Sequence, residues 1–256
     1  MAPNDADPRP RYQQIADDLR AAIHRGDITP GDALPSEREL MVRYDTTRGT
    51  VRRAFGVLIA EGLVVAHHGR GVFLRQRPAV HRLGHQRHSS AQRQSGMGPF
   101  TAEARRQGQC PEQQLLEVVA VPPPTFVGQR LGLPATELAL VRRHLLLADD
   151  VPMQLADSWF SYELVKNTSI AQPEKIPRGV HAVLEQDLGY ELDHFIEDLS
   201  FRMPTPDEAR ALRLSPGVPV VRLINTLYDA HESPLQVTDF ILAGDRHELQ
   251  YKVSAR

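Results

Sequence analysis

Apolar residues in the first quarter of the chain recur with helical spacing, in three segments that are separated by turn-forming residues. The first helix is expected over residues 12–25, and Gly26 follows where a left-handed C-terminal cap belongs. A short second helix is expected over residues 36–44, and a third over residues 47–62. The buried stripe predicted for the third helix consists of Val51, Ala54, Phe55, Leu58 and Ile59.

Two capping signals fix where the second and third helices begin. Ser36 and Glu39 have the spacing of a capping box, in which each side chain satisfies a backbone N–H group of the first turn. Thr47 is a good N-cap for the third helix. The pattern then changes to two short strands, residues 63–65 and 72–74, around a polar turn. Helix, short helix, helix and hairpin is the element order of a winged helix-turn-helix.

The third helix carries basic and hydroxyl side chains on the side opposite its apolar stripe. In a helix-turn-helix the first residues of this helix face base edges in the major groove. Arg48 and Arg52 lie four residues apart on one face, from which they can reach guanine or phosphate. Gly49 has a poor helix propensity, but the absence of a side chain lets the backbone approach DNA closely. Arg70, between two glycines in the hairpin turn, is placed to enter the minor groove.

The charge distribution agrees with this interpretation. Residues 1–93 contain 15 arginines and 10 acidic residues, a balance of +5, and the remainder of the chain carries −7, which gives the net charge of −2. A basic front and an acidic rear indicate that the front meets a polyanion.

The motifs "LPSEREL", "TTRGTVRRAFGVLIAEGLV" and "GRGVFL" resemble the DNA-binding domain of GntR-type bacterial transcription regulators, over about residues 10–75. Val72 stands where threonine is commoner in that family. The resemblance implies that double-stranded operator DNA is a partner. From the helix and the resemblance together, the residues predicted to contact DNA are Ser36, Arg38, Thr46, Thr47, Arg48, Gly49, Thr50, Arg52, His68, Gly69, Arg70 and Gly71.

The predicted organisation is a winged helix-turn-helix domain at residues 10–76, a linker at 77–98 and a second domain at 99–256. The linker has almost no apolar content and is expected to be exposed. His81, His85 and His88 have the spacing of one helical face, which invites a metal hypothesis. Gly84 interrupts that helix and no acidic residue is nearby, so no metal site is predicted.

The second domain contains an internal repeat. The segments "LGLPATELALVRRHLLLADDVPMQLADSWF" and "LRLSPGVPVVRLINTLYDAHESPLQVTDFI" begin at Leu131 and Leu212, and each is expected to form a β-hairpin. Residues 102–107, 181–187 and 205–212 are expected to be helical, the last with a capping box at Thr205 and Glu208. The fold class is therefore α+β, with an antiparallel sheet.

This second half is similar to the effector-binding (UTRA) domain of the HutC subfamily of GntR regulators, which shares its fold with chorismate lyase. The resemblance implies a ligand-responsive repressor that is a homodimer and is released by a small-molecule effector. Many members carry Arg-x-Arg before the hairpin turn, suited to clamping an anion, but the corresponding positions here are His144 and Leu146. The predicted effector contacts are Thr101, Arg142, His144, Ser158 and Tyr228.

Other functional classes have little support in the sequence. No apolar run approaches the roughly 18 residues of a membrane span, and the polar, acidic N-terminus differs from a secretory signal. The single cysteine, Cys110, indicates a reducing environment, so a bacterial, cytoplasmic, nucleoid-associated location is expected. No phosphate loop or nucleophile elbow is present, so neither enzyme activity nor a cofactor is predicted. A lyase-like enzyme tethered to DNA and a constitutive DNA binder with a vestigial pocket remain the alternatives.

Overall fold

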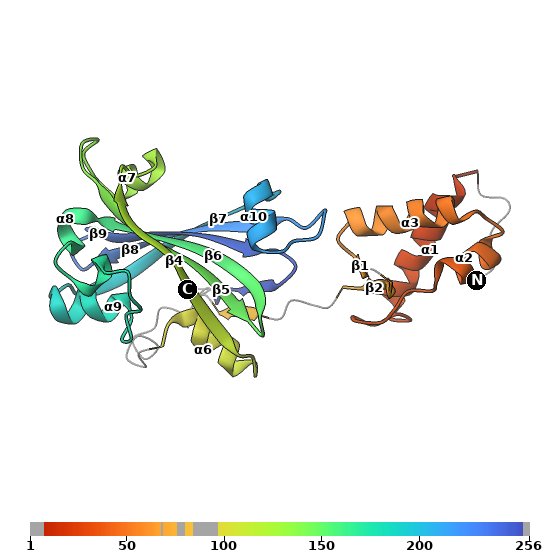
Figure 1. The fold of residues 1–256 in the computed structure, drawn as a ribbon, viewed down its shortest axis with the longest axis horizontal. Coiled ribbons are helices and arrows are strands. Elements are labelled where there is room, and N and C mark those ends of the chain that lie inside the picture. The colour runs from red at the N-terminus through yellow and green to blue at the C-terminus, as the bar shows by residue number, and fades with distance from the viewer. Residues whose placement is uncertain (1–7, 68, 76–79, 84–96, 253–256) are drawn as a thin grey trace. The chain divides into compact units, whose positions relative to one another are not determined.

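The computed structural model describes residues 8–67, 69–75, 80–83 and 97–252. The chain divides into two compact units, one formed by residues 1–77 with 214–218 and the other by residues 78–213 with 219–256. The first unit contains three helices and a two-stranded hairpin, and the second contains a six-stranded antiparallel sheet with helices on both faces (Figure 1). The predicted α+β class is confirmed in both halves.

Capping residues set the limits of the three helices in the first unit. These helices are α1 (Arg11–Arg25), α2 (Glu37–Tyr44) and α3 (Arg48–Ala60). Gly26 ends α1 with a φ of 80°, a left-handed conformation that glycine adopts without strain. Ser36 and Glu39 form both hydrogen bonds of the capping box, and the Thr47 hydroxyl accepts the N–H of Thr50. The predicted helix limits are confirmed within two residues.

One hydrophobic core holds the helices and the hairpin of the first unit together. Val51, Ala54, Phe55 and Leu58 of α3 are buried in it, as predicted, and Ile59 is partly buried against it. Strand β1 (Val64–His67) pairs antiparallel with β2 (Gly71–Leu74), and the hairpin is fixed to the helices because its first and last residues also enter the core. The apolar side of α3 is thus buried, and its polar side faces solvent.

The sheet of the second unit has the strand order β4-β5-β6-β9-β8-β7, with every neighbouring pair antiparallel. Its strands are β4 (Pro111–Val121), β5 (Ala139–Ala148), β6 (Val151–Ser161), β7 (Leu192–Arg202), β8 (Val220–Asp229) and β9 (Pro234–Ala243). The two predicted hairpins are β5–β6 and β8–β9, so the hairpin prediction is confirmed.

The sequence repeat becomes a local two-fold symmetry of this sheet. Each half runs strand, helix, hairpin, and the two hairpins meet at the central β6–β9 pair. Asp157 and Asp239, which occupy equivalent positions in the two repeats, are directly paired in the register of β6 and β9. Equivalent residues therefore point to the same face of the sheet, and this places Gln154 and Gln236 on one common face.

Helices cover both faces of the sheet (Figure 1). They are α6 (Pro99–Arg106), α7 (Thr125–Leu131), α8 (Tyr162–Val165), α9 (Val180–Ala182) and α10 (Pro206–Ala211), with a 3₁₀ turn at Ser169–Ala171 and a π-helical turn at Val183–Asp187. On one face α7 packs over Trp159 and Val237. On the other face Phe100 of α6 packs on Leu146, and the helical turns after α8 bury Phe160. The three helices predicted in this half are confirmed.

The segment expected to be an exposed linker contains a strand. Strand β3 (Val80–Leu83) pairs in parallel with β10 (His247–Gln250), near the other end of the chain. Arg82 is only 1% exposed and donates to Glu197 of β7 at 2.6 Å. A buried ion pair therefore anchors this part of the connector to the second unit. His81 lies in this strand and not in a helix, and His85 and His88 lie outside the described residues.

Candidate nucleic-acid interface and effector cavity

The N-terminal turn of α3 presents the predicted DNA-contacting residues to solvent. Arg48 and Arg52 have side chains that are 65% and 63% exposed, on the helix face opposite the core. Thr47 is exposed beside them, and its hydroxyl lies 3.1 Å from that of Thr50. Four N–H groups at a helix start lack partners within the helix, and the helix dipole there favours an anion. This surface therefore offers two cations, two hydroxyls and a positive helix end at one place.

Glu37, at the first turn of α2, connects the two exposed arginines. One carboxylate oxygen accepts from Nε of Arg48, and the other accepts from Nε of Arg52 at 2.9 Å. The hydrogen bond from Arg52, and to a smaller extent that from Arg48, lowers the pKa of the Glu37 carboxyl group. Glu37 is therefore ionised at neutral pH. The sequence argument missed Glu37, although its place between Ser36 and Arg38 in the motif was a signal that could have drawn attention to it.

The remaining predicted contacts of the first unit surround this centre. Ser36, Arg38 and Gly49 are exposed, and Thr46 is half-buried. In the hairpin, Gly69 and Gly71 have φ values of 72° and 109°, a backbone region that favours glycine. The chain therefore turns sharply on both sides of Arg70. His68, which was also predicted, lies outside the described residues.

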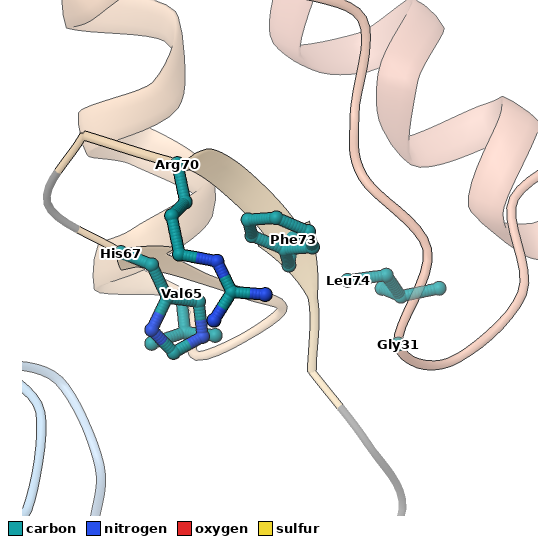
Figure 2. Close-up of a pocket in the computed structure, with 6 residues that line it drawn as sticks. All are labelled: Gly31, Val65, His67, Arg70, Phe73 and Leu74. Carbon is teal, nitrogen blue, oxygen red and sulfur yellow. The ribbon is translucent and has the colours of Figure 1, made fainter.

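Arg70 is exposed at this turn, but its side chain folds back onto the hairpin (Figure 2). Its guanidinium carbon lies 5.8 Å from the centre of the Phe73 ring, and His67 meets the same ring edge-on at 5.3 Å. These side chains line a small hollow together with Gly31, Val65 and Leu74 (Figure 2). An exposed cation–π contact contributes only about 0.5–1 kcal/mol, so an anionic partner can displace it easily.

A larger cavity of about 450 Å³ lies in the second unit, over the sheet face that carries Gln154 and Gln236. All six strands of the sheet contribute to its floor, and α6 and residues 175–182 supply its walls. Thr101, Arg142, His144 and Ser158, all predicted from the sequence, line it. Tyr228 does not line it, and instead stacks on His194 with 5.0 Å between ring centres.

The charged groups around the cavity are all cationic within the described part of the chain. Arg105, Arg142, Lys175 and Arg178 line it, and no aspartate or glutamate among the described residues does. Arg178 is engaged by the carboxylate of Asp187. Sequence reasoning did not identify Arg105, Lys175 or Arg178, because the walls come from segments that are far from the floor strands in sequence.

Arg142, a predicted effector contact on the cavity floor, has both terminal nitrogens hydrogen-bonded within the protein. Its Nη1 donates to the carbonyls of Ile170 and Gln172 at 2.8 and 2.7 Å, and its Nη2 donates to the carbonyl of Glu174 at 2.7 Å. Burial lowers its pKa, yet an arginine keeps its charge at neutral pH. Arg142 therefore holds the loop that forms a cavity wall, and only its Nε is buried without a hydrogen-bond partner in the described structure.

His144, the next residue of β5 on the same face as Arg142, is neutral at physiological pH. Burial, and then the neighbouring charge of Arg142, lower its pKa to about 4. A neutral imidazole carries one N–H donor and one acceptor nitrogen. The side chain can therefore pair with a neutral polar group, and it adds no charge to the cavity.

Two buried amides on the floor have unused hydrogen-bonding atoms. Gln154 Nε2 and Gln236 Oε1 are buried and have no partner among the described residues, whereas Gln236 Nε2 donates to Thr238 at 2.9 Å. A buried polar atom without a partner costs about 1–3 kcal/mol, and in a cavity this is a common sign of a ligand or water position. The internal repeat, which aligns these two glutamines, was the sequence signal that could have identified them.

The described residues show neither a membrane-crossing helix nor a metal-binding cluster. No helix in residues 8–252, apart from the undescribed gaps, is both long and apolar enough to span a bilayer. No group of three or more His, Cys, Asp or Glu side chains in the described segments is placed to hold a metal ion.

Comparisons with known proteins match both halves of the chain. Residues 11–74 match the gntR family of bacterial regulatory proteins, and residues 106–248 match the UTRA domain. The chain is 31% identical to an HTH-type transcriptional regulator of Streptomyces coelicolor, with coverage of 94% of this chain and 92% of the relative. It is 26% identical to the HTH-type transcriptional repressor NagR of Bacillus subtilis, with coverage of 95% of each. A crystal structure of a GntR-family regulator matches with a TM-score of 0.67 at 24% identity, over 97% of this chain and 99% of the other.

Proposed function

Because this chain belongs to the GntR family of bacterial transcription regulators, in the HutC branch that carries a UTRA domain, we propose that it is a repressor. In this proposal it binds a palindromic operator as a homodimer in the bacterial cytoplasm and leaves the operator when a small molecule binds its second unit. The family is one of transcription regulators and not of enzymes. The observation that carries the proposal is the pair of exposed arginines at the capped N-terminus of α3.

The proposed operator contact places the start of α3 in the major groove. Arg48 and Arg52 read base edges there, and Thr47 and Thr50 donate to phosphate oxygens. Around them, the further proposed contacts are Ser36, Arg38, Thr46, Gly49, His68, Gly69, Arg70 and Gly71. Phosphate contacts set the position of the helix, and the base contacts supply the specificity.

The proposed effector is a small anionic molecule with neutral polar groups. Four cationic side chains and no carboxylate line the cavity in the described part of the chain, which favours a negative charge on the ligand. The terminal nitrogens of Arg142 already donate to backbone carbonyls. The negative charge of the ligand is therefore expected to pair with Lys175 and Arg105 at the rim. Thr101, His144, Ser158, Gln154 and Gln236 supply neutral hydrogen-bonding partners on the floor. An acid that also carries hydroxyl or amide groups has this combination.

The proposed dimer uses the free edge of the sheet at β7. Among the described strands it pairs only with β8, and its Phe201 is 72% exposed. Leu199, on the same strand, and Met203, just beyond it, are also exposed. Large apolar side chains gathered on an unpaired strand edge are a usual sign of an interaction surface. A symmetric pair would carry two copies of α3, and a palindromic operator would match them when its half-sites lie one DNA turn, about 34 Å, apart.

The test is a selection from genomic DNA. Purified protein is mixed with sheared DNA of its own organism, and bound fragments are recovered and sequenced at two salt concentrations. We expect a small set of enriched fragments that share a palindrome, with binding that falls steeply as salt rises. Recovery of unrelated fragments in proportion to their abundance would contradict the proposed operator. The effector part is tested with the substrates and products of the enzymes that are encoded beside the enriched fragments. If none of these compounds releases the protein from the operator, the effector part of the proposal is wrong and the protein is a constitutive DNA binder.

A further inference from the structure

The ion pairs of Glu37 use a particular atom of each arginine. Both Arg48 and Arg52 contact the carboxylate through Nε, the donor nearest the aliphatic stem. The terminal Nη1 and Nη2 groups of both arginines have no hydrogen-bond partner within the described residues. Glu37 itself is 28% exposed, while the two arginines are more than half exposed. One carboxylate therefore holds two largely exposed guanidinium groups by their inner edges and leaves their terminal donors available.

We propose that Glu37 is a positioning residue for DNA sequence readout, which fixes Arg48 and Arg52 side by side before the operator arrives. The inference rests on the proposed function, because it assigns a role within the same α3 surface. A guanine is read by two parallel donors of one arginine, and the terminal Nη pair supplies two parallel donors. A long, free arginine must give up rotamer freedom when it binds, and a side chain that is already held gives up less.

A competing explanation is that Glu37 only weakens DNA binding by repelling phosphate. Local charge argues against this, since one carboxylate is surrounded by two guanidinium groups and the group as a whole stays cationic. The two explanations predict opposite effects when the carboxylate is removed. Loss of a repulsive charge strengthens binding to every DNA sequence, whereas loss of a positioning group weakens binding to the operator alone.

The first experiment compares Glu37→Ala and Glu37→Gln with Asp27→Asn in the full-length protein. Asp27 pairs with Arg25 beyond the end of α1, so its substitution makes the same change in net charge away from α3. Affinity is measured for the operator recovered in the genomic selection and for a random duplex of equal length, at one salt concentration. We expect Glu37→Ala to lower the operator-to-random affinity ratio about tenfold, which is within the range that one bidentate base contact contributes.

Glu37→Gln keeps one carbonyl acceptor and can hold one arginine, so its ratio should fall between wild type and Glu37→Ala. Asp27→Asn should change both affinities by the same factor and leave the ratio unaltered. The proposal is overturned if Glu37→Ala changes the two affinities equally, or if it strengthens operator binding.

The second experiment needs no DNA. The side-chain Nε–H signals of arginine are recorded by proton–nitrogen NMR for the free wild-type protein and for Glu37→Ala. We expect two signals, assigned by Arg48→Lys and Arg52→Lys, to be shifted and slow to exchange in wild type and to move to the free-arginine position in Glu37→Ala. Identical spectra would overturn the positioning role. If the genomic selection finds no operator but these signals behave as expected, then the proposed function fails and the arginine–carboxylate contact stands.

Discussion

Two glycines on α3, Gly49 and Gly56, both have room for a side chain. A Cβ atom at Gly49 would meet only the Thr47 hydroxyl, at 3.9 Å, and one at Gly56 would meet nothing within 4 Å. Neither glycine has a positive φ, so the backbone demands glycine at neither position. Since packing within the chain does not explain Gly49, which lies at the proposed DNA surface, close approach of the helix to DNA is the better explanation there.

Substitution by alanine separates stability from DNA binding at these two positions. Gly49→Ala and Gly56→Ala should each raise the free energy of unfolding by about 0.5–1 kcal/mol, because glycine weakens a helix. Only Gly49→Ala should reduce operator affinity, since its methyl group lies between the backbone and the groove. Chemical denaturation and operator titration measure the two effects. If operator binding by Gly49→Ala equals that of Gly56→Ala, Gly49 has no part in DNA approach.

The depressed pKa of His144 makes the second unit sensitive to mild acid. In the folded state its pKa is about 4, below the usual value near 6.5 in the unfolded chain. Between pH 4 and pH 6.5 the imidazole is protonated in the unfolded state but not in the folded state. The free energy of unfolding is therefore highest above pH 6.5 and falls as the pH drops toward 4. We expect the melting temperature of the second unit to fall less between pH 7 and pH 5 in His144→Gln than in wild type. Equal losses in the two proteins would show that other groups cause the acid sensitivity.

Sequence patterns identified single residues well where the physics is local. Ser36 and Thr47 were predictable because a cap involves a side chain and backbone N–H groups only three residues away. The partners of Arg142 were not, because its donors reach carbonyls about 30 residues further along the chain. The role of Glu37 was missed for the same reason, since its arginines lie in the next helix.

The elements followed the same division between local and distant causes. The hairpins β5–β6 and β8–β9 were predictable because each is a pair of apolar runs around a short polar turn. The edge strands β4 and β7 were not anticipated, since most of their residues remain partly or fully exposed and show no clean alternation. The parallel β3–β10 pair joins segments from opposite ends of the second unit, which no local pattern can indicate.

Strand β3 contains a buried arginine, Arg82. Arg82 donates to Glu197 at 2.6 Å and lies over the ring of Phe240, 5.1 Å from its centre. Removing one partner of a buried ion pair leaves the other charge uncompensated, which typically destabilises a protein by about 3–5 kcal/mol. We expect Arg82→Ala to destabilise the second unit by the lower end of that range, because Glu197 also accepts hydrogen bonds from Asn225 and Tyr251.

Fluorescence of Trp159 measures this effect without interference from the first unit. It is the only tryptophan of the chain and is buried beneath α7 in the second unit. The matched control is Arg106→Ala, which removes an exposed arginine of α6. This substitution should leave the free energy of unfolding within about 0.5 kcal/mol of the wild-type value. If the two variants unfold alike, the ion pair of β3 contributes nothing measurable.

At the scale of the whole molecule, each edge strand of the large sheet pairs with one neighbour among the described strands. Strand β4 forms one edge, with Leu116 exposed, and β7 forms the other, with Phe201 more exposed still. The β7 edge carries several large apolar side chains and the β4 edge carries one, so the dimer proposed above is assigned to β7. A palindromic operator offers two half-sites, and a dimer that engages both gains from the high effective concentration of the second contact.

A charge placed on each edge in turn tests this assignment. Phe201→Asp should convert the dimer to a monomer, because it buries a carboxylate in the proposed interface, while Leu116→Asp on β4 should leave the dimer intact. Light scattering after size exclusion gives the molar mass of each variant. Phe201→Asp should also weaken binding to the full operator by about a hundredfold, the low end of the avidity gain, and leave binding to a single half-site unchanged. If Leu116→Asp is the variant that dissociates, the subunits pair through β4, and the two copies of α3 must then be placed on the operator by a different arrangement of the second units.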